Sequence, residues 1–185
     1  MTTDQQKRGK SGGTGFQPVQ SFQATRRCLP HWQQPGKVCF ITWRCKKDEL
    51  LSPEERTITL AALRHWDGQK WTLYAAVVLP DHVHVLAQPL DHGEGGTIDL
   101  GEIIQDVKGF SAWKINRQRG SKGSLWQDER YDRIVRDAAE FLEKWEYIRN
   151  NPLRAGMASS PEDYPWLYER GDMRAQAGKP VPPSK

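Results

Sequence analysis

Two apolar, β-branched runs stand next to each other near the middle of the chain, with only Pro80-Asp81 between them. The first extends from Trp71 to Leu79 and the second from His82 to Gln88. Runs of this length and composition are typical of buried strands, and a short link of Pro and Asp is typical of a tight turn. The pair therefore predicts two neighbouring strands in one sheet.

A helix is expected before this pair of strands. Ser52 is placed to cap it, with Pro53 at the first helical position and Glu55 completing a capping box. Apolar residues then recur at helical spacing until Asp67-Gly68, which ends the helix.

The other elements follow from alternating or helical spacing of apolar residues. Strands are expected over 37–44 and 124–127, and helices over 100–119 and 137–150, the last ended by Asn151-Pro152. The resulting order, βαββαβα, predicts an α+β fold in which helices pack on a ferredoxin-like or RRM-like antiparallel sheet.

The ends of the 185-residue chain differ from its middle. Residues 1–27 contain Ser11-Gly12-Gly13-Thr14-Gly15 and show little periodicity, so we expect a mostly disordered basic arm. Residues 28–157 form the expected single domain, and residues 158–185 a C-terminal extension that is partly disordered.

Charge is unevenly distributed. The first 30 residues hold five basic residues and one acidic residue, which leaves the rest of the chain neutral. A general argument for nucleic-acid binding from net charge therefore fails. Within the neutral part, residues 108–136 hold eight basic and three acidic residues, with Trp113 and Trp126 among them. Such a patch suits phosphate contacts and base stacking, and it is equally compatible with a solvated helix face.

Several classes of protein are disfavoured. No run approaches the 18 or more apolar residues of a membrane span, and the start of the chain lacks the apolar core of a secretory signal. Its three cysteines, Cys28, Cys39 and Cys45, have no CxxC spacing, so neither a disulfide framework nor a zinc site is expected. We predict a soluble protein of a reducing compartment such as the cytoplasm.

The strongest local signal is His82-Val83-His84-Val85. Because side chains two apart on a strand share a face, His82 and His84 present two imidazoles side by side while Val83 and Val85 face the core. Two neutral imidazoles provide half of a divalent metal site. A bare His-x-His pair is also compatible with one hydrogen-bonded and one exposed histidine.

A second motif, on the last expected helix, supports the prediction of a metal site. Tyr147 and Asn151 are four residues apart and therefore share a helix face, while Ile148 anchors the helix to the core. A phenol beside a metal-held phosphate is the arrangement for nucleophilic attack with a phosphotyrosine intermediate. Neighbouring positive charge, such as Arg149, Arg133 or the metal, would help to stabilise a phenolate. Alone, such a tyrosine is also compatible with the edge of the core.

The pair of motifs His82-Val83-His84 and Tyr147 resembles the HUH single-strand DNA endonucleases. More closely, the chain is similar to the REP-associated tyrosine transposases, relatives of the transposases of single-strand insertion sequences. The resemblance covers about residues 29–157 and has several motifs in the same order. These are Leu29-Pro30-His31-Trp32, Pro35-Gly36, Thr42-Trp43-Arg44, residues 77–84, 108–112 and 125–127, Tyr131-Asp132-Arg133, and residues 147–156.

The resemblance implies roles for particular residues. His82 and His84 would be metal ligands, and Tyr147 would be the nucleophile that joins to a 5′ phosphate and frees a 3′ hydroxyl. The insertion-sequence relatives carry Gln four residues after the tyrosine as a further ligand, whereas this chain has Asn151, which is one methylene shorter. A divalent ion, Mg²⁺ or Mn²⁺, fits the Lewis-acid role. Tyr131 is a competing nucleophile, although no amide side chain follows it at the fourth position.

The implied partner is hairpin DNA with a single-stranded flank, bound by a monomer or a homodimer. A DNA partner would place the protein at the nucleoid in the cytoplasm. Exposed bases would stack on Trp43 or Trp126. Phosphates would meet the basic side chains Arg44, Lys108, Lys114, Arg130 and Arg133.

Three functions stay open at this level. The first is a metal-dependent single-strand DNA transposase that acts through a 5′-phosphotyrosine. The second is a domesticated hairpin-binding protein without turnover, and the third a phosphodiesterase in which water attacks and Tyr147 is structural. Formation of a covalent protein–DNA adduct distinguishes them.

Overall fold

The computed structural model describes residues 36–92 and 96–171. The expected arm over 1–27, the Leu29-Pro30-His31-Trp32 motif and the chain from residue 172 lie outside the described residues.

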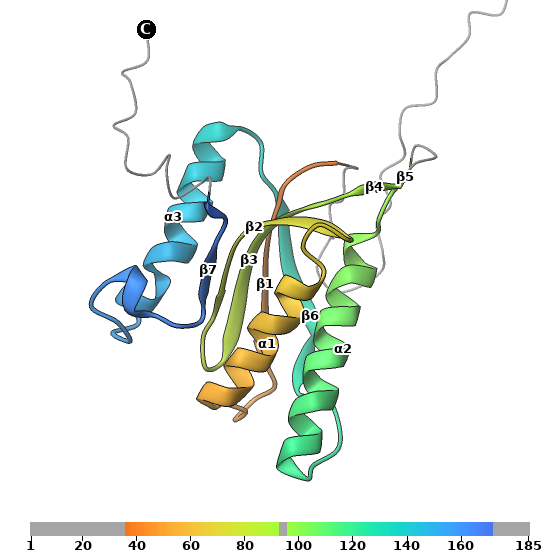
Figure 1. Cartoon of the computed structure of the whole chain (residues 1–185), viewed down its shortest axis with the longest axis vertical. Helices are drawn as coiled ribbons and strands as arrows, with labels where there is room; N and C mark the ends of the chain where they lie inside the picture. Colours follow the sequence, from red (N-terminus) through yellow and green to blue (C-terminus); the bar gives the residue numbers. More distant parts are fainter. Residues whose placement is uncertain (1–35, 93–95, 172–185) are drawn as a thin grey trace, which may run out of the picture.

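A five-stranded antiparallel sheet forms the centre of the molecule, in the order β6-β1-β3-β2-β7 (Figure 1). Its strands are β1 (Cys39–Cys45), β2 (Trp71–Val78), β3 (His82–Pro89), β6 (Trp126–Ile134) and β7 (Leu167–Glu169). The adjacent pair predicted around Pro80-Asp81 is β2 and β3. A separate pair of two-residue strands, β4 (Asp91–His92) and β5 (Gly96–Thr97), precedes the second helix.

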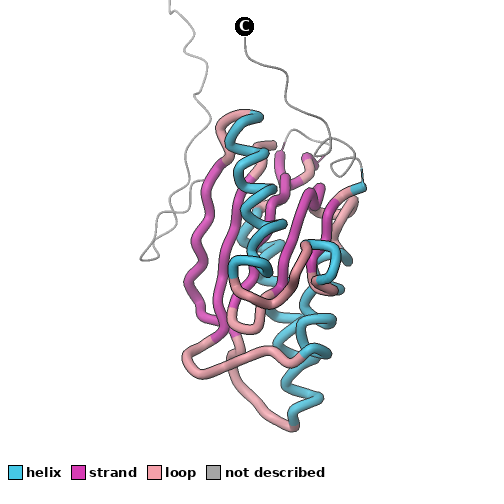
Figure 2. The backbone as a smooth tube through the Cα atoms, turned by 90° about the vertical axis from the view of Figure 1, so that its left-hand side faces the viewer, coloured by secondary structure: helices cyan, strands magenta, loops and turns pink. Residues whose placement is uncertain are grey.

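Helices cover both faces of this sheet. They are α1 (Pro53–His65), α2 (Leu100–Arg119) and α3 (Ala138–Arg154), with a short 3₁₀ helix, η1 (Pro161–Asp163), before β7. Helices α1 and α2 lie on one face and α3 lies on the other (Figure 2). The helix start at Ser52 has the predicted capping box with Glu55. The βαββαβ core confirms the expected ferredoxin-like α+β fold. Over the residues that the structure describes, no helix is long and apolar enough to span a membrane.

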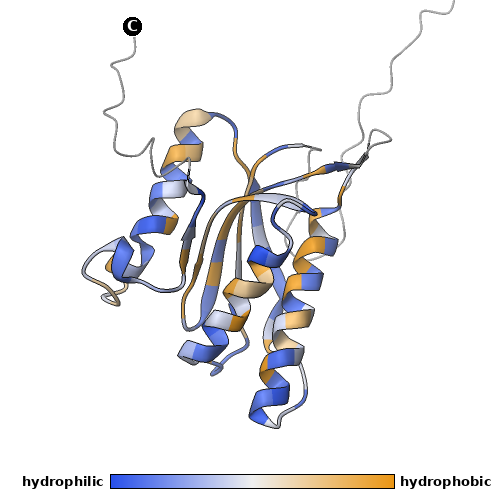
Figure 3. Ribbon diagram, in the orientation of Figure 1, coloured by the Kyte–Doolittle hydropathy of each residue, from blue (hydrophilic) through white to orange (hydrophobic). Residues whose placement is uncertain are grey.

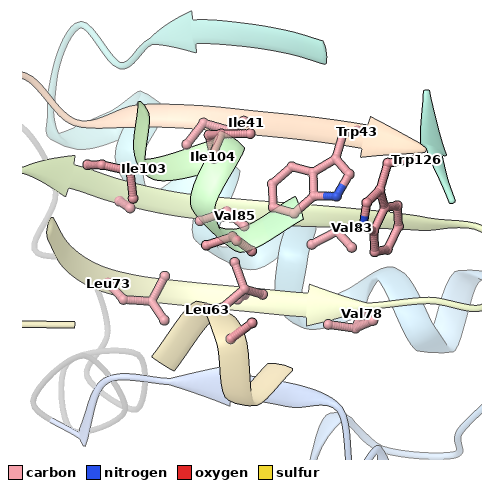
Figure 4. Packing of buried hydrophobic residues seen from close by; sticks show 14 of the residues in the cluster. Ile41, Trp43, Leu63, Leu73, Val78, Val83, Val85, Ile103, Ile104 and Trp126 are labelled. Atoms are coloured by element: carbon pink, nitrogen blue, oxygen red, sulfur yellow. The ribbon is translucent and has the colours of Figure 1, made fainter. Parts of the chain in front are cut away.

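The first hydrophobic core lies between the sheet and the helices α1 and α2. The inward side chains of β1, β2 and β3 meet apolar residues of both helices there (Figure 4). Val83 and Val85 of β3 are fully buried in this core, as their alternation predicted.

The second hydrophobic core lies on the other face, beneath α3. Trp145 and Ile148 of α3 pack there against Ala75 and Val77 of β2 and Leu86 of β3. Colouring by hydropathy shows apolar and polar residues alternating along the helices (Figure 3), as expected for helices with one buried side.

Three elements differ from expectation. Strand β6 is longer than the expected 124–127 because backbone pairing with β1 sustains it through polar residues that carry no apolar pattern. Helix α3 continues through Asn151-Pro152, since a proline in the last turn removes only one N–H, and the helix stops before Gly156, whose φ is +67°. Strand β7 has only three residues and is defined by its pairing with β2.

Candidate functional site

The two histidines of β3 lie together on the α3 face of the sheet. Their rings are 4.8 Å apart, centroid to centroid, and nearly perpendicular. The strand register places Thr42 of β1 opposite His84 and Arg44 opposite His82. Side chains of two strands therefore meet at this point of the face.

Each imidazole is held through its Nδ1 atom. The His82 Nδ1 atom is 2.6 Å from the Asp81 carboxylate, which accepts the Nδ1–H and leaves the lone pair on Nε2. The His84 Nδ1 atom is 2.7 Å from the Thr42 hydroxyl. Within the described part of the chain, the Nε2 atom of His84 is buried and has no hydrogen-bond partner. When His84 Nδ1–H donates to the Thr42 hydroxyl, Nε2 carries the lone pair, which is the form in which histidine binds a metal ion.

The electrostatic surroundings keep His84 neutral. Burial, reinforced by His82 and Arg44, lowers the pKa of His84 to about 3. An imidazole that does not take up a proton near neutral pH keeps its lone pair available to a ligand.

Tyr147 approaches the histidines from α3. Its ring lies 5.1 Å from that of His84 and 5.7 Å from that of Phe40, edge to face in both cases. The guanidinium of Arg154 lies 5.4 Å from the Tyr147 ring centroid. The structure thus brings together the tyrosine and the histidine pair, which are more than 60 residues apart in sequence.

Asn151 follows one turn after Tyr147 and is buried. The start of α3 lies near the end of β3, because Phe141 contacts Tyr74 and the Tyr74 hydroxyl donates to Gln88. Tyr147, farther along α3, lies beside His84 near the start of β3. Helix α3 therefore runs antiparallel to β3. Asn151 therefore lies toward the His82 end. In residues 36–92 and 96–171, no three His, Cys, Asp or Glu side chains gather where they could hold a metal ion. The histidine pair fits a divalent ion only with oxygen donors such as the Asn151 amide, DNA or solvent.

Two ion-pair clusters hold the ends of α3. Near its start, the buried Glu140 accepts from Arg136 and pairs with Arg133 of β6. Near its end, Arg149 donates to Glu169 of β7 and to Glu162 of η1. The sequence analysis missed this second cluster because η1 and β7 carry no pattern that indicates where they pack.

The structure corrects the expected base-stacking role of Trp43 and Trp126. These side chains are 1% and 2% exposed and pack edge to face in the first core, 6.2 Å apart (Figure 4). The alternation of β1 turns Trp43 toward the helices, and the Trp126 indole donates to the Ser111 hydroxyl. Neither ring is available to a base.

The expected phosphate contacts are divided between the two faces. Arg130 is buried and pairs with Asp132, and Lys108 donates to the backbone carbonyl of Gln127, so both act within the protein. Lys114 is exposed on α2.

Of the five basic side chains expected to contact phosphates, Arg44 and Arg133 lie on the face of the sheet that carries the histidines. Their side chains are 59% and 43% exposed. Arg44 pairs with Asp81 at 3.5 Å. Tyr131 lies on the same face, opposite Thr42 in the register.

Comparison with known sequences places the chain near one named family. A comparison with protein-family models finds no match. A Haemophilus influenzae protein described as a "Putative REP-associated tyrosine transposase" is 25% identical over 107 residues, which are 55% of this chain and 61% of that protein. The chain thus matches less than two thirds of this relative. A second Haemophilus influenzae protein, described as an "Uncharacterized protein", is 27% identical over 144 residues, 62% of this chain and 79% of that protein.

Comparison with solved structures supports the fold. A REP-associated tyrosine transposase bound to a REP hairpin matches with a TM-score of 0.63 and 19% identity, over 81% of this chain and 85% of that one. Together with the curated relative, this match confirms the resemblance to REP-associated tyrosine transposases in sequence and in fold.

Proposed function

We propose that this protein is a metal-dependent single-strand DNA transposase that cleaves and rejoins DNA beside a hairpin through a 5′-phosphotyrosine. One observation carries the proposal: the Tyr147 ring lies 5.1 Å from the ring of His84, whose buried Nε2 has no partner among the described residues. A phenol next to two oriented imidazoles is suited to attack on a metal-held phosphate.

In the cleavage step, the Tyr147 oxygen attacks the phosphorus of the scissile phosphodiester. The Tyr147 hydroxyl gives up its proton to solvent as a bond forms between its oxygen and phosphorus. The bond to the 3′ oxygen breaks, and that oxygen leaves with the electron pair and takes up a proton from solvent to become the 3′ hydroxyl. Arg154, beside the Tyr147 ring, and Arg44, opposite His82, supply positive charge that favours the phenolate and the phosphate. Attack by a 3′ hydroxyl on the phosphotyrosine reverses the step and frees Tyr147, which accounts for rejoining.

His82 and His84, with the Asn151 amide oxygen, would hold the divalent ion, Mg²⁺ or Mn²⁺. When bound, the ion supplies Lewis-acid polarisation of the phosphate. Asp81 and Thr42 orient the two imidazoles by holding their Nδ1 atoms, so that the Nε2 lone pairs remain free for coordination.

The DNA partner is proposed by extension from the relatives. The solved structural match contains a REP hairpin. We extend hairpin binding to this chain because it shares the fold and has two exposed arginines beside the histidine pair.

The test is covalent adduct formation. Purified protein is incubated with end-labelled hairpin DNA bearing randomised single-stranded flanks, in Mg²⁺, Mn²⁺ or chelator, and analysed on denaturing gels. Wild type, Tyr147→Phe and Tyr131→Phe are compared. We expect a metal-dependent adduct in wild type and Tyr131→Phe that Tyr147→Phe does not form.

Other outcomes distinguish the alternatives. Loss of the adduct only in Tyr131→Phe would move the nucleophile to Tyr131. Tight binding with no adduct and no cleavage would favour a hairpin-binding protein, and cleavage without an adduct would favour a phosphodiesterase that uses water.

A further inference from the structure

Helix α3 leaves part of its face of the sheet open. It packs mainly on β2 and β3, and it reaches β1 and β6 where Tyr147 meets Phe40 and where Glu140 pairs with Arg133. Farther along the same face, β1 and β6 carry exposed side chains, which we call the open strip: Arg44, Tyr131 and Arg133. The open strip begins directly beside the histidine pair, because Arg44 is opposite His82 in the register.

Tyr131 is the aromatic residue of the open strip, and it is 48% exposed. It is the cross-strand partner of Thr42, whose hydroxyl is 2.7 Å from His84 Nδ1. Tyr131 and His84 are thus separated by two strand spacings, about 10 Å. A nucleotide next to a phosphate held at the histidines would reach the Tyr131 ring.

The chemistry of the open strip suits an unpaired nucleotide. An exposed aromatic ring gives a base a face on which to stack, and every base has a π-face to offer. Arg44 and Arg133 place positive charge on the same surface for the neighbouring phosphates. The Tyr131 ring thus has arginines on the same surface and lies next to the proposed reaction site.

Exposed aromatic residues of α2 provide a contrast. Phe110 and Trp113 are 49% and 57% exposed, but α2 lies on the opposite face of the sheet (Figure 1). Their rings already lie near the cations Lys114 and Arg117, at 6.0 Å and 5.7 Å. They lie across the sheet from Tyr147 and serve as internal controls for non-specific stacking.

We infer that the ring of Tyr131 is the stacking site for the unpaired base next to the phosphate that Tyr147 attacks. This inference rests on the proposed function for the identity of that phosphate. It assigns Tyr131 to substrate binding through its ring, and its hydroxyl takes no part in the reaction.

The test separates binding from cleavage. Hairpin DNA with short dT flanks carries the fluorescent base 2-aminopurine at one flank position at a time, and binding is measured in the Tyr147→Phe background. We expect quenching at one or two adjacent positions, lost in Tyr131→Ala and kept in Tyr131→Phe and Trp113→Ala. With Tyr147 present, Tyr131→Ala should raise KM for adduct formation on the order of tenfold, with kcat changed much less.

Each remaining outcome is informative. Loss of quenching in Tyr131→Phe would overturn a ring-based role, as would an equal loss in Trp113→Ala or uniform quenching at every position. An adduct in wild type without Tyr131-dependent quenching would leave the proposed function standing and overturn this inference. Tyr131-dependent quenching without any adduct would support the stacking site and count against the proposed function alone.

Discussion

The face of the sheet that carries α1 and α2 is mainly apolar, with the buried Arg130–Asp132 ion pair on β6, whereas the face that carries α3 combines apolar packing with two imidazoles and exposed arginines. The same strand, β3, contributes to both faces: Val83 and Val85 point to the first and His82 and His84 to the second. The first face is closed by two helices that contact each other. The second is covered by α3 over β2 and β3, and also over Phe40 of β1, and is open at Arg44 of β1 and Tyr131 of β6.

This difference separates stability from chemistry within one sheet. A closed apolar face supplies the hydrophobic driving force of folding. The second face can therefore hold a buried nitrogen without a partner, which costs free energy, and can leave a surface open to a nucleic acid. Substitutions of neighbouring β3 residues that face opposite sides of the sheet test the comparison directly.

The largest effect is expected for His84→Leu. The variant loses a proposed metal ligand, and adduct formation should fall by more than about a thousandfold, because a bound ion would contribute several kcal/mol to the transition state. Its free energy of unfolding should stay within about 1 kcal/mol of wild type or rise, since an unsatisfied buried nitrogen is removed. Gel assays and urea denaturation measure the two quantities.

The matched control for His84→Leu is His65→Leu, which changes an exposed histidine of α1. It should form the adduct at the wild-type rate. An adduct that persists in His84→Leu would contradict the proposal that the reaction takes place on the α3 face.

A smaller effect is expected for Asp81→Asn. The asparagine has an amide NH₂ and a weaker acceptor beside His82 Nδ1, so the imidazole is less firmly oriented. The affinity for Mn²⁺ should fall about 10- to 100-fold, measured by calorimetry on the metal-free protein. Asp48→Asn, in the exposed β1–α1 connection, is the control. Unchanged Mn²⁺ affinity in Asp81→Asn would contradict an orienting role.

Val85→Ala tests the closed face. Truncating this fully buried side chain should lower the free energy of unfolding by about 2 kcal/mol, from lost burial and the cavity left behind. Adduct formation per folded molecule should not change. A loss of activity larger than the loss of folded protein would show that the two faces are coupled and would weaken the comparison.

The smallest effect concerns the pH dependence of stability. Hydrogen bonds, first that from Arg136, hold the pKa of Glu140 below its usual value of 4.5. Because the folded-state pKa is lowered, this stabilisation is complete above about pH 4.5 and is lost as pH falls through the folded-state value. Glu140→Gln should therefore show a shallower loss of stability below pH 4.5 in urea denaturation.

The control for Glu140→Gln is Glu143→Gln, which removes an exposed partner of Lys144 on the same helix. It should keep the wild-type pH profile. Identical profiles for Glu140→Gln and wild type would mean that the ion pairs of Glu140 do not contribute to holding the start of α3.

Much of the fold was predictable from local pattern. The β2–β3 pair, the capping box of α1 and the assignment of Val83 and Val85 to the core follow from side-chain periodicity and from hydrogen bonds between near neighbours. Strand β7 and most of β6 were not predictable, because backbone pairing with β2 and β1 defines them and backbone pairing has no side-chain signature.

The candidate site, like the fold, was predictable only in part. The sequence by itself determined that His82 and His84 share a face of their strand and that Tyr147 and Asn151 share a face of their helix, since these relations depend only on the periods of strand and helix. Only the tertiary structure decided that the two faces meet, that Trp43 and Trp126 are buried, and that Tyr131 lies open beside the histidines. The reason is physical: which strand pairs with which, and which face a helix covers, is set by the packing of the whole sheet.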